Sequence, residues 1–209
     1  MSNQRNQLHI PAGPGPSAAA SLLRVTRIVG GQARGRHLSV PPRGTRPTSD
    51  RAREALFNTL RSELDVAGAR VLDLFAGSGA VGLEALSRGA AAAVFVESDR
   101  PAARVLADNI ASLGLPGAVL RRLAVDSYLG AAGADEPFDL VFADPPYALA
   151  SAAVASMLGL LVSGGWLAQP AIVVVERSAH DPEPGWPNEI KAIKQRRYGE
   201  GCLWYGRRT

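Results

Sequence analysis

Short apolar runs alternate with amphipathic stretches through the middle of the chain. Runs such as Arg70–Phe75, Phe138–Ala143 and Ala171–Glu176 are almost continuously apolar, which is typical of strands buried on both faces of a sheet. The full pattern predicts strands at Arg70–Phe75, Ala93–Val96, Val119–Leu123, Phe138–Ala143 and Ala171–Glu176, and helices at Gly79–Arg88, Pro101–Leu113, Ser127–Ala131 and Ala150–Val162. Such alternation indicates an α/β fold with a mostly parallel sheet covered by helices on both faces.

The beginning of the chain departs from this alternation. Val25–Val29 and Arg36–Val40 are short strand-like runs separated by glycines, which predicts a small β-arm. A helix is expected from about Arg51 to Leu64, with Thr48 or Asp50 as its N-cap. The arm therefore precedes the first helix of the main fold.

The end of the chain also differs from the central pattern. Ile190–Arg197 and Cys202–Tyr205 read as strands on either side of a turn at Tyr198–Gly201. Two strands joined by so short a connection are antiparallel. We therefore expect a C-terminal antiparallel hairpin that completes the sheet.

Length and composition fit one domain with a real hydrophobic core. The chain has 209 residues, too few for two large domains. Met1–Arg24 is rich in proline, glycine and alanine, and is expected to be a disordered extension. Residues 25–48 would form the basic N-terminal arm and residues 49–209 the main domain.

Several classes of protein are disfavoured by what the sequence contains. Cys202 is the single cysteine, so no internal disulfide can form, and the three histidines are scattered without metal-ligand spacing. Apolar stretches of about 18 residues are absent, so no membrane span is expected. These features predict a cytoplasmic protein that uses no metal.

Positive charge is concentrated at the two ends of the chain. The formal net charge is +4, yet residues 54–190 contain seventeen acids and only eight bases. Residues 24–53 contain eight arginines and one acid, and residues 191–208 contain six bases and one acid. Basic segments of this kind suit a polyanion such as nucleic acid, although a solubilising surface is an equally simple interpretation.

A glycine-rich turn lies between the first central strand and the helix after it. In Asp73-Leu-Phe-Ala-Gly-Ser-Gly79, glycines permit close approach of backbone to a ligand, and the helix N-terminus offers N–H groups. Ligands of open α/β sheets bind beyond the carboxyl ends of the strands. The alternative is a tight turn without a ligand. If the turn holds a cofactor, the candidate residues are Asp73, Phe75, Ala76, Gly77 and Gly79.

Acidic residues follow the next two strands. Glu97, with Ser98 beside it, lies just past the second strand, where a carboxylate can accept hydrogen bonds from both hydroxyls of a ribose. Asp99 is the alternative acid for that role. Asp126 follows the third strand and is a candidate contact for an adenine amino group.

The strand Phe138–Ala143 leads directly into Asp144-Pro-Pro-Tyr147. The prolines donate no backbone N–H, so carbonyl groups and the Asp144 carboxylate are left as acceptors. These acceptors match the two N–H groups of an exocyclic amine, and the Tyr147 ring offers a flat face for a base. The motif predicts a catalytic site made by Asp144, Pro145, Pro146 and Tyr147.

The glycine turn and the Asp-Pro-Pro-Tyr motif together resemble the S-adenosylmethionine-dependent amino-methyltransferases. Within that group, Arg46–Asn58 and Leu72–Ala90, with Arg197-Tyr-Gly in the closing hairpin, resemble the 16S ribosomal RNA guanine-N2-methyltransferase D family. The resemblance extends from Val25 to Arg208. It implies a Rossmann-like class I methyltransferase fold with a mostly parallel seven-stranded sheet, and S-adenosyl-L-methionine as the cofactor.

The resemblance also implies a substrate and a set of contacts. The substrate would be a guanine of small-subunit ribosomal RNA, in an assembled or nearly assembled 30S subunit, and the enzyme a monomer. Thr48 is expected to contact the methionine end of the cofactor. The arginines expected to bind RNA are Arg34, Arg36, Arg43, Arg46, Arg51, Arg196 and Arg197.

Three alternatives stay open from the sequence. An adenine-N6 DNA methyltransferase shares the Asp-Pro-Pro-Tyr motif, but usually carries a target-reading region of its own. A glutamine-N5 protein methyltransferase usually has asparagine at the position of Asp144. A non-catalytic RNA-binding assembly factor would not need the intact glycine turn, Glu97 and Asp144.

Met1–Arg24 has no counterpart in the resemblance. We therefore expect either that translation begins at Val25 or that the segment is dispensable for methylation of ribosomal RNA. Loss of activity on deletion of residues 1–24 would contradict both expectations.

Overall fold

The structure is a computed structural model that describes residues 25–41, 49–131, 133 and 136–209. The expected extension at residues 1–24 lies outside these ranges. Thr48, Arg43 and Arg46 lie outside them as well, so their expected contacts remain predictions.

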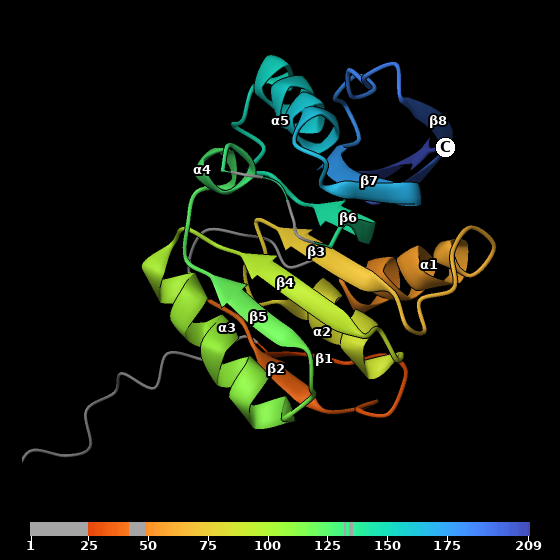
Figure 1. Cartoon of the computed structure of the whole chain (residues 1–209). Helices are drawn as coiled ribbons and strands as arrows, with labels where there is room; N and C mark the ends of the chain where they lie inside the picture. The colour runs from red at the N-terminus through yellow and green to blue at the C-terminus, as the bar shows by residue number, and fades with distance from the viewer. Residues whose placement is uncertain (1–24, 42–48, 132, 134–135) are drawn as a thin grey trace, which may run out of the picture.

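A seven-stranded sheet with the order β5-β4-β3-β6-β7-β9-β8 forms the centre of the molecule (Figure 1). The five strands β5, β4, β3, β6 and β7 are parallel to their neighbours in the sheet, whereas β9 is antiparallel to both β7 and β8. The Rossmann-like fold with its C-terminal hairpin is thereby confirmed. The strands are β3 (Arg70–Leu74), β4 (Ala92–Val96), β5 (Ala118–Arg121), β6 (Phe138–Ala143), β7 (Leu167–Ser178), β8 (Ile190–Tyr198) and β9 (Gly201–Arg208).

Helices cover both faces of the sheet because successive strand residues point to opposite sides. On one face, Val71, Phe142 and Val174 pack with α1, α2 and α3, and on the other, Leu72, Val141 and Val173 pack with α4 and α5. Within the described ranges, no helix is both long and apolar enough to cross a bilayer. The helices are α1 (Asp50–Leu60), α2 (Ala80–Ser87), α3 (Arg100–Leu113), α4 (Val125–Leu129) and α5 (Ser151–Ser163).

The N-terminal arm is a separate two-stranded antiparallel sheet, β1 (Val25–Arg27) and β2 (His37–Ser39). Its residues Ile28 and Leu38 are fully buried in the core shared by α1, α2 and α3. Asn109 of α3 accepts from the backbone N–H of Ser39 and donates to its carbonyl, both at 2.9 Å. The arm is therefore packed into the main fold through α3.

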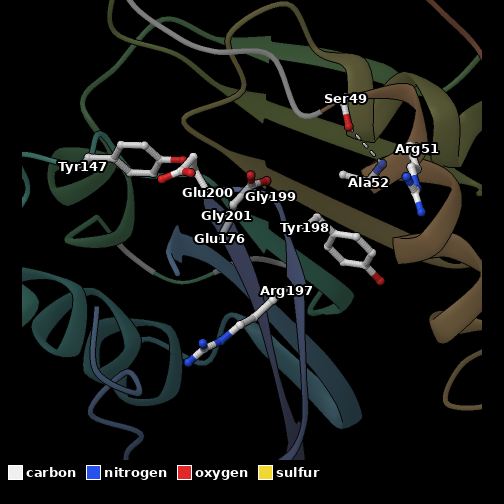
Figure 2. Close-up of a pocket in the computed structure, with 10 residues that line it drawn as sticks. All are labelled: Ser49, Arg51, Ala52, Tyr147, Glu176, Arg197, Tyr198, Gly199, Glu200 and Gly201. Carbon is white, nitrogen blue, oxygen red and sulfur yellow. Dashed lines mark hydrogen bonds between the residues drawn. The ribbon is translucent and has the colours of Figure 1, made fainter. Parts of the chain in front are cut away.

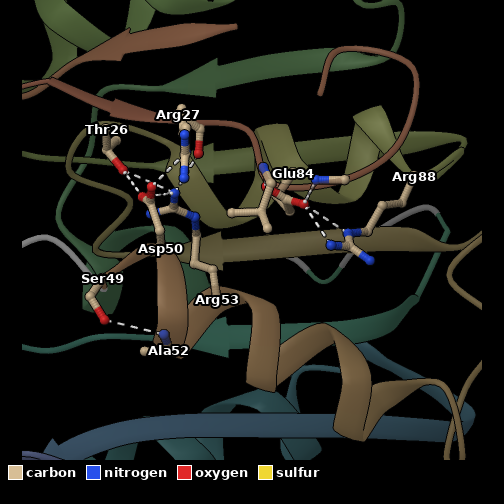
Figure 3. Close-up of polar contacts among 10 residues, drawn as sticks. Thr26, Arg27, Ser49, Asp50, Ala52, Arg53, Glu84 and Arg88 are labelled. Atoms are coloured by element: carbon tan, nitrogen blue, oxygen red, sulfur yellow. Dashed lines mark hydrogen bonds and ion pairs between the residues drawn. The ribbon is translucent and has the colours of Figure 1, made fainter. Parts of the chain in front are cut away.

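Polar contacts also tie the arm to α1 and α2 (Figure 3). The buried Arg53 side chain donates to Asp50 Oδ1 at 2.8 Å and to the Arg27 carbonyl at 2.6 Å. Glu84 of α2 accepts from the backbone N–H groups of Val29 and Gly30, both at 2.7 Å. The sequence pattern gave no sign of these contacts.

The expected cap of the first helix is wrong. Ser49, not Thr48 or Asp50, is the N-cap, because its Oγ accepts from the backbone N–H of Ala52 at 3.2 Å. Asp50 is instead in the first helical turn, where its carboxylate accepts from Thr26 Oγ1 at 2.6 Å. The helix also ends at Leu60, four residues before the expected Leu64.

Candidate active site

The glycine turn between β3 and α2 has a constrained backbone. Phe75 has φ 57°, a left-handed conformation that is unusual for a residue with a side chain. Gly77 and Gly79 also have positive φ angles, 54° and 77°. The turn is joined to the neighbouring strand by a hydrogen bond from the Ala76 N–H to the Val96 carbonyl, 3.1 Å. Such conformations concentrate at functional sites, where the surrounding structure enforces them.

Two residues of this turn have supporting roles in the structure. Asp73 is 2% exposed and accepts from the Gly82 N–H of α2 at 2.9 Å, and burial raises its pKa to about 8. A Cβ on Gly79 would lie 2.2 Å from Leu106 Cδ1 of α3. Gly79 thus lets the Leu106 side chain of α3 pack closely against the turn. Direct contact of Asp73 or Gly79 with a cofactor stays a prediction.

Glu97 lies beside the glycine turn, as the strand order requires. It follows β4, the neighbour of β3, is 9% exposed, and accepts from the Gly77 N–H at 2.8 Å and the Asp99 N–H at 2.7 Å. Each carboxylate oxygen has a second lone pair, so Glu97 can accept ligand hydroxyls while holding the turn. Exposed Ser98 follows it directly.

Asp99 is not an interchangeable substitute for Glu97. Its Oδ2 accepts from the Ala102 N–H at 2.9 Å and so caps α3. Asp126 lies in the first turn of α4, just after β5, and is exposed. Since β5 is parallel to β4, Asp126 is at the same edge of the sheet as Glu97.

Asp144 follows β6 directly, on the other side of β3. Its backbone N–H donates to the Leu74 carbonyl at 3.4 Å, so the Asp-Pro-Pro-Tyr motif begins beside the glycine turn. Pro145 is buried, whereas Pro146 and Tyr147 are exposed. The expected cofactor-binding turn and the expected catalytic motif are therefore adjacent in space.

A buried arginine that the sequence analysis did not identify holds this motif. The Arg177 side chain is 5% exposed and donates to the carbonyls of Pro146, at 3.3 Å, and Leu149, at 2.9 Å. Its charge is paired with Asp181 at 2.9 Å. Arg177 is the last-but-one residue of β7, and only the pairing of β6 with β7 brings it to the motif.

The environment of Asp144 disfavours its charged form. Burial, and then the nearby Glu176 and Asp73 carboxylates, raise the pKa of Asp144 well above its usual range, and Arg177 opposes this only in part. Without a ligand, Asp144 therefore retains its proton to higher pH than an ordinary aspartate does. A ligand that brings N–H donors or positive charge would favour the carboxylate.

A cleft of about 560 Å³ lies in front of the motif, between the start of α1, Tyr147, the end of β7 and the β8–β9 turn (Figure 2). Its volume is in the range of small-molecule sites. Tyr147, half exposed, and Glu176 line it together with Tyr198. Among the residues that the structure describes, no three His, Cys, Asp or Glu side chains are grouped as metal ligands would be.

The five described arginines among those expected to bind RNA lie on different elements. Arg51 and Arg197 line the cleft, although Figure 2 shows the Arg197 side chain pointing away from its other lining residues. Arg34 and Arg36 are exposed on the arm, and Arg36 donates to the Ser112 carbonyl at 2.6 Å. Arg196 is exposed on β8. A further basic hollow beside Ser98, formed by Arg100, Arg104 and Arg122, was not expected.

Known proteins resemble the chain over most of its length. The family model described as conserved hypothetical protein 95 matches residues 26–207. Ribosomal RNA small subunit methyltransferase D of Escherichia coli (strain K12) is 43% identical over 162 residues, which are 77% of this chain and 79% of that protein. The protein of the same name from Haemophilus influenzae is 38% identical over 75% of this chain and 80% of its own length. A solved structure from Escherichia coli is 38% identical with a TM-score of 0.77, covering 88% of this chain and 98% of that one.

Proposed function

The chain belongs to the family described as conserved hypothetical protein 95, and from this membership we propose that it methylates the N2 amine of a guanine in 16S ribosomal RNA with S-adenosyl-L-methionine. The match to this chain spans about four fifths of the length of two relatives, which are both named ribosomal RNA small subunit methyltransferase D. The observation that carries the proposal is the position of Asp144 beside the glycine turn and Glu97. An amine acceptor and a cofactor site are then neighbours at one edge of the sheet.

The residues of this edge match the parts of the cofactor. Glu97 has acceptor capacity for ribose hydroxyls, and the strained turn at Phe75–Gly79 leads into the N-terminus of α2, the end of a helix that suits a negatively charged group such as a carboxylate. When bound, S-adenosylmethionine supplies a methyl group that its sulfonium has already activated.

Asp144 and the Pro145 carbonyl would hold the guanine amine. The amine lone pair is delocalised into the purine ring, so the amine is a weak nucleophile. Two acceptors on its N–H groups favour a pyramidal nitrogen and stabilise the positive charge that develops there. Tyr147 stacks on the base, which leaves its helical stack to enter the cleft. Positioning of the two reactants supplies much of the remaining rate.

The RNA would be held by arginines at the cleft and on the arm. Arg51 and Arg197 at its rim, with Arg34 on the arm, suit phosphate groups. We propose that the substrate is the assembled or nearly assembled small subunit in the cytoplasm, and that the enzyme acts as a monomer. Thr48 is proposed to contact the methionine end of the cofactor, and Asp126 the adenine.

Transfer of label from S-adenosylmethionine to small ribosomal subunits that lack their own methylation tests the function. Free ribosomal RNA, DNA and a release-factor-like protein are offered in parallel, and the modified nucleoside is identified by mass. We expect N2-methylguanosine at one site in the subunit. Label in DNA or protein would overturn the RNA assignment, and no label together with no cofactor binding would favour an RNA-binding factor.

Replacement of Glu97 tests the cofactor site. Glu97→Ala removes both the ribose acceptor and the carboxylate that holds the Gly77 N–H, so we expect S-adenosylmethionine to bind at least roughly tenfold more weakly. Isothermal titration measures the dissociation constant. The matched control is Glu189→Ala, which removes an exposed glutamate. Equal affinity for both variants would place the ribose elsewhere.

A further inference from the structure

Glu176 is brought next to Asp144 by the pairing of two strands that are far apart in the sequence. In the parallel register of β6 and β7, the last pair is Ala143 with Val175, so Asp144, which directly follows β6, comes beside Glu176 of β7. Phe142 and Val174, two residues earlier, both pack on the α1 side of the sheet. Because successive strand residues alternate between the two faces, Asp144 and Glu176 project to that same side. Their backbones are separated by the usual spacing of neighbouring strands, about 4.8 Å.

The carboxylate of Glu176 lies in the cleft, not in the core. Glu176 is partly exposed and lines the cleft together with Tyr147 (Figure 2). A Cβ on Gly201 would lie 3.1 Å from Glu176 Oε1, so the glycine at the start of β9 leaves room for this carboxylate. Arg177, the next residue, projects to the opposite face and holds the Pro146 and Leu149 carbonyls. The cleft thus keeps one further acceptor beside the expected amine site.

Two ionised carboxylates that are neighbours repel each other, so the doubly charged pair is costly in this partly buried site. Glu176 is one of the groups that raise the pKa of Asp144. A ligand that places N–H donors against both carboxylates would relieve this cost. Guanine presents such a pair, because the N2 amine and the N1–H are neighbouring donors on one edge of the base. Adenine has an acceptor at N1, and a carboxylate oxygen facing it would be repelled because neither atom carries a hydrogen to donate.

We propose that Glu176 accepts the N1–H of the target guanine while Asp144 accepts the N2 amine, so that Glu176 selects guanine. This inference rests on the proposed function, because it takes the base in the cleft to be a guanine. Glu176 is then a specificity-determining residue that touches the base but does not touch the transferred methyl group.

The test compares two target bases in small subunits reconstituted with a single replaced nucleotide. One carries guanine and the other 2,6-diaminopurine, which keeps the 2-amino group but has an acceptor at N1. We expect the wild-type protein to methylate the diaminopurine subunit about 10²-fold more slowly, since a site built to accept a hydrogen bond rejects a base without the donor. Equal rates on the two subunits would overturn the proposal even if no variant could be purified.

The variant Glu176→Gln should reverse part of this preference. Its amide can donate to N1 of diaminopurine but accepts from guanine only as a neutral group, so the guanine-to-diaminopurine rate ratio should fall by roughly tenfold or more. The matched control is Glu189→Gln, which changes an exposed glutamate that does not line the cleft and should keep the wild-type ratio.

A purely structural role for Glu176 would lower both rates together and leave the ratio unchanged, which would also overturn the inference. If the wild-type protein transfers no methyl group to the guanine subunit, the proposed function itself fails. Failure of the proposed function can be told apart from failure of the Glu176 inference, because the first is seen with the wild-type protein and the guanine subunit alone.

Discussion

Asp144→Ala is expected to lower the rate of methyl transfer by about 10²–10³-fold, the usual loss when one preorganised group that stabilises transition-state charge is removed. The carboxylate is held at the end of β6 beside the glycine turn, and the Asp144 N–H bond to Leu74 belongs to the backbone, so the loop keeps its anchor. Affinity for S-adenosylmethionine should stay close to that of the wild type, because Glu97 and the turn are unchanged. Single-turnover rates and isothermal titration separate the two quantities. An equal loss in cofactor affinity would show that Asp144 acts at the cofactor and not at the amine.

The pH profile gives a second measurement on the same residue. Burial, Glu176 and Asp73 raise the pKa of Asp144, and Arg177 partly offsets them. Because the ionised carboxylate is the better acceptor, the wild-type rate should increase with pH through this raised pKa and then level off. Asp144→Asn cannot titrate, so its lower rate should lack this acid limb. An unchanged acid limb in Asp144→Asn would assign the titration to another group.

The largest loss of stability is expected for Glu84→Ala. Glu84 is fully buried, accepts from the N–H groups of Val29 and Gly30, and pairs with Arg88 at 2.8 Å (Figure 3). Its removal leaves two backbone donors and one cation without their acceptor, which costs about 3–5 kcal/mol of unfolding free energy. Thermal unfolding should show a midpoint roughly 10 °C lower.

Two variants serve as controls for Glu84→Ala. Glu54→Ala removes an exposed glutamate from α1 and should change the unfolding free energy by less than about 0.5 kcal/mol. Glu84→Gln keeps one acceptor oxygen but no charge, and should fall between Glu84→Ala and the wild type. If Glu84→Ala were as stable as Glu54→Ala, the arm would not depend on this carboxylate.

The elements of the central domain could be predicted because their signals are local. Strands β3 and β6 are apolar runs that lead directly into the glycine turn and the Asp-Pro-Pro-Tyr motif. The helix α3 has Pro101 in its first turn and Gly114 as its C-cap. Boundaries were less accurate. The Ser49 cap was missed because three neighbouring residues (Thr48, Ser49 and Asp50) are all good caps. The hydrogen bond from Thr26 to Asp50, which engages the Asp50 carboxylate elsewhere, joins distant segments of the chain.

The kind and order of the elements, the glycine turn, the Asp144–Tyr147 motif and the family resemblance could all be recognised in the sequence, because each of these is written in residues that are consecutive along the chain. Only the tertiary structure decided that Glu176 stands beside Asp144, that Arg177 holds the Pro146 carbonyl and that Glu84 anchors the arm. These contacts depend on which strands are neighbours and on their register. A single glutamate or arginine in an apolar strand or helix carries no local signal of the partner that folding will place next to it.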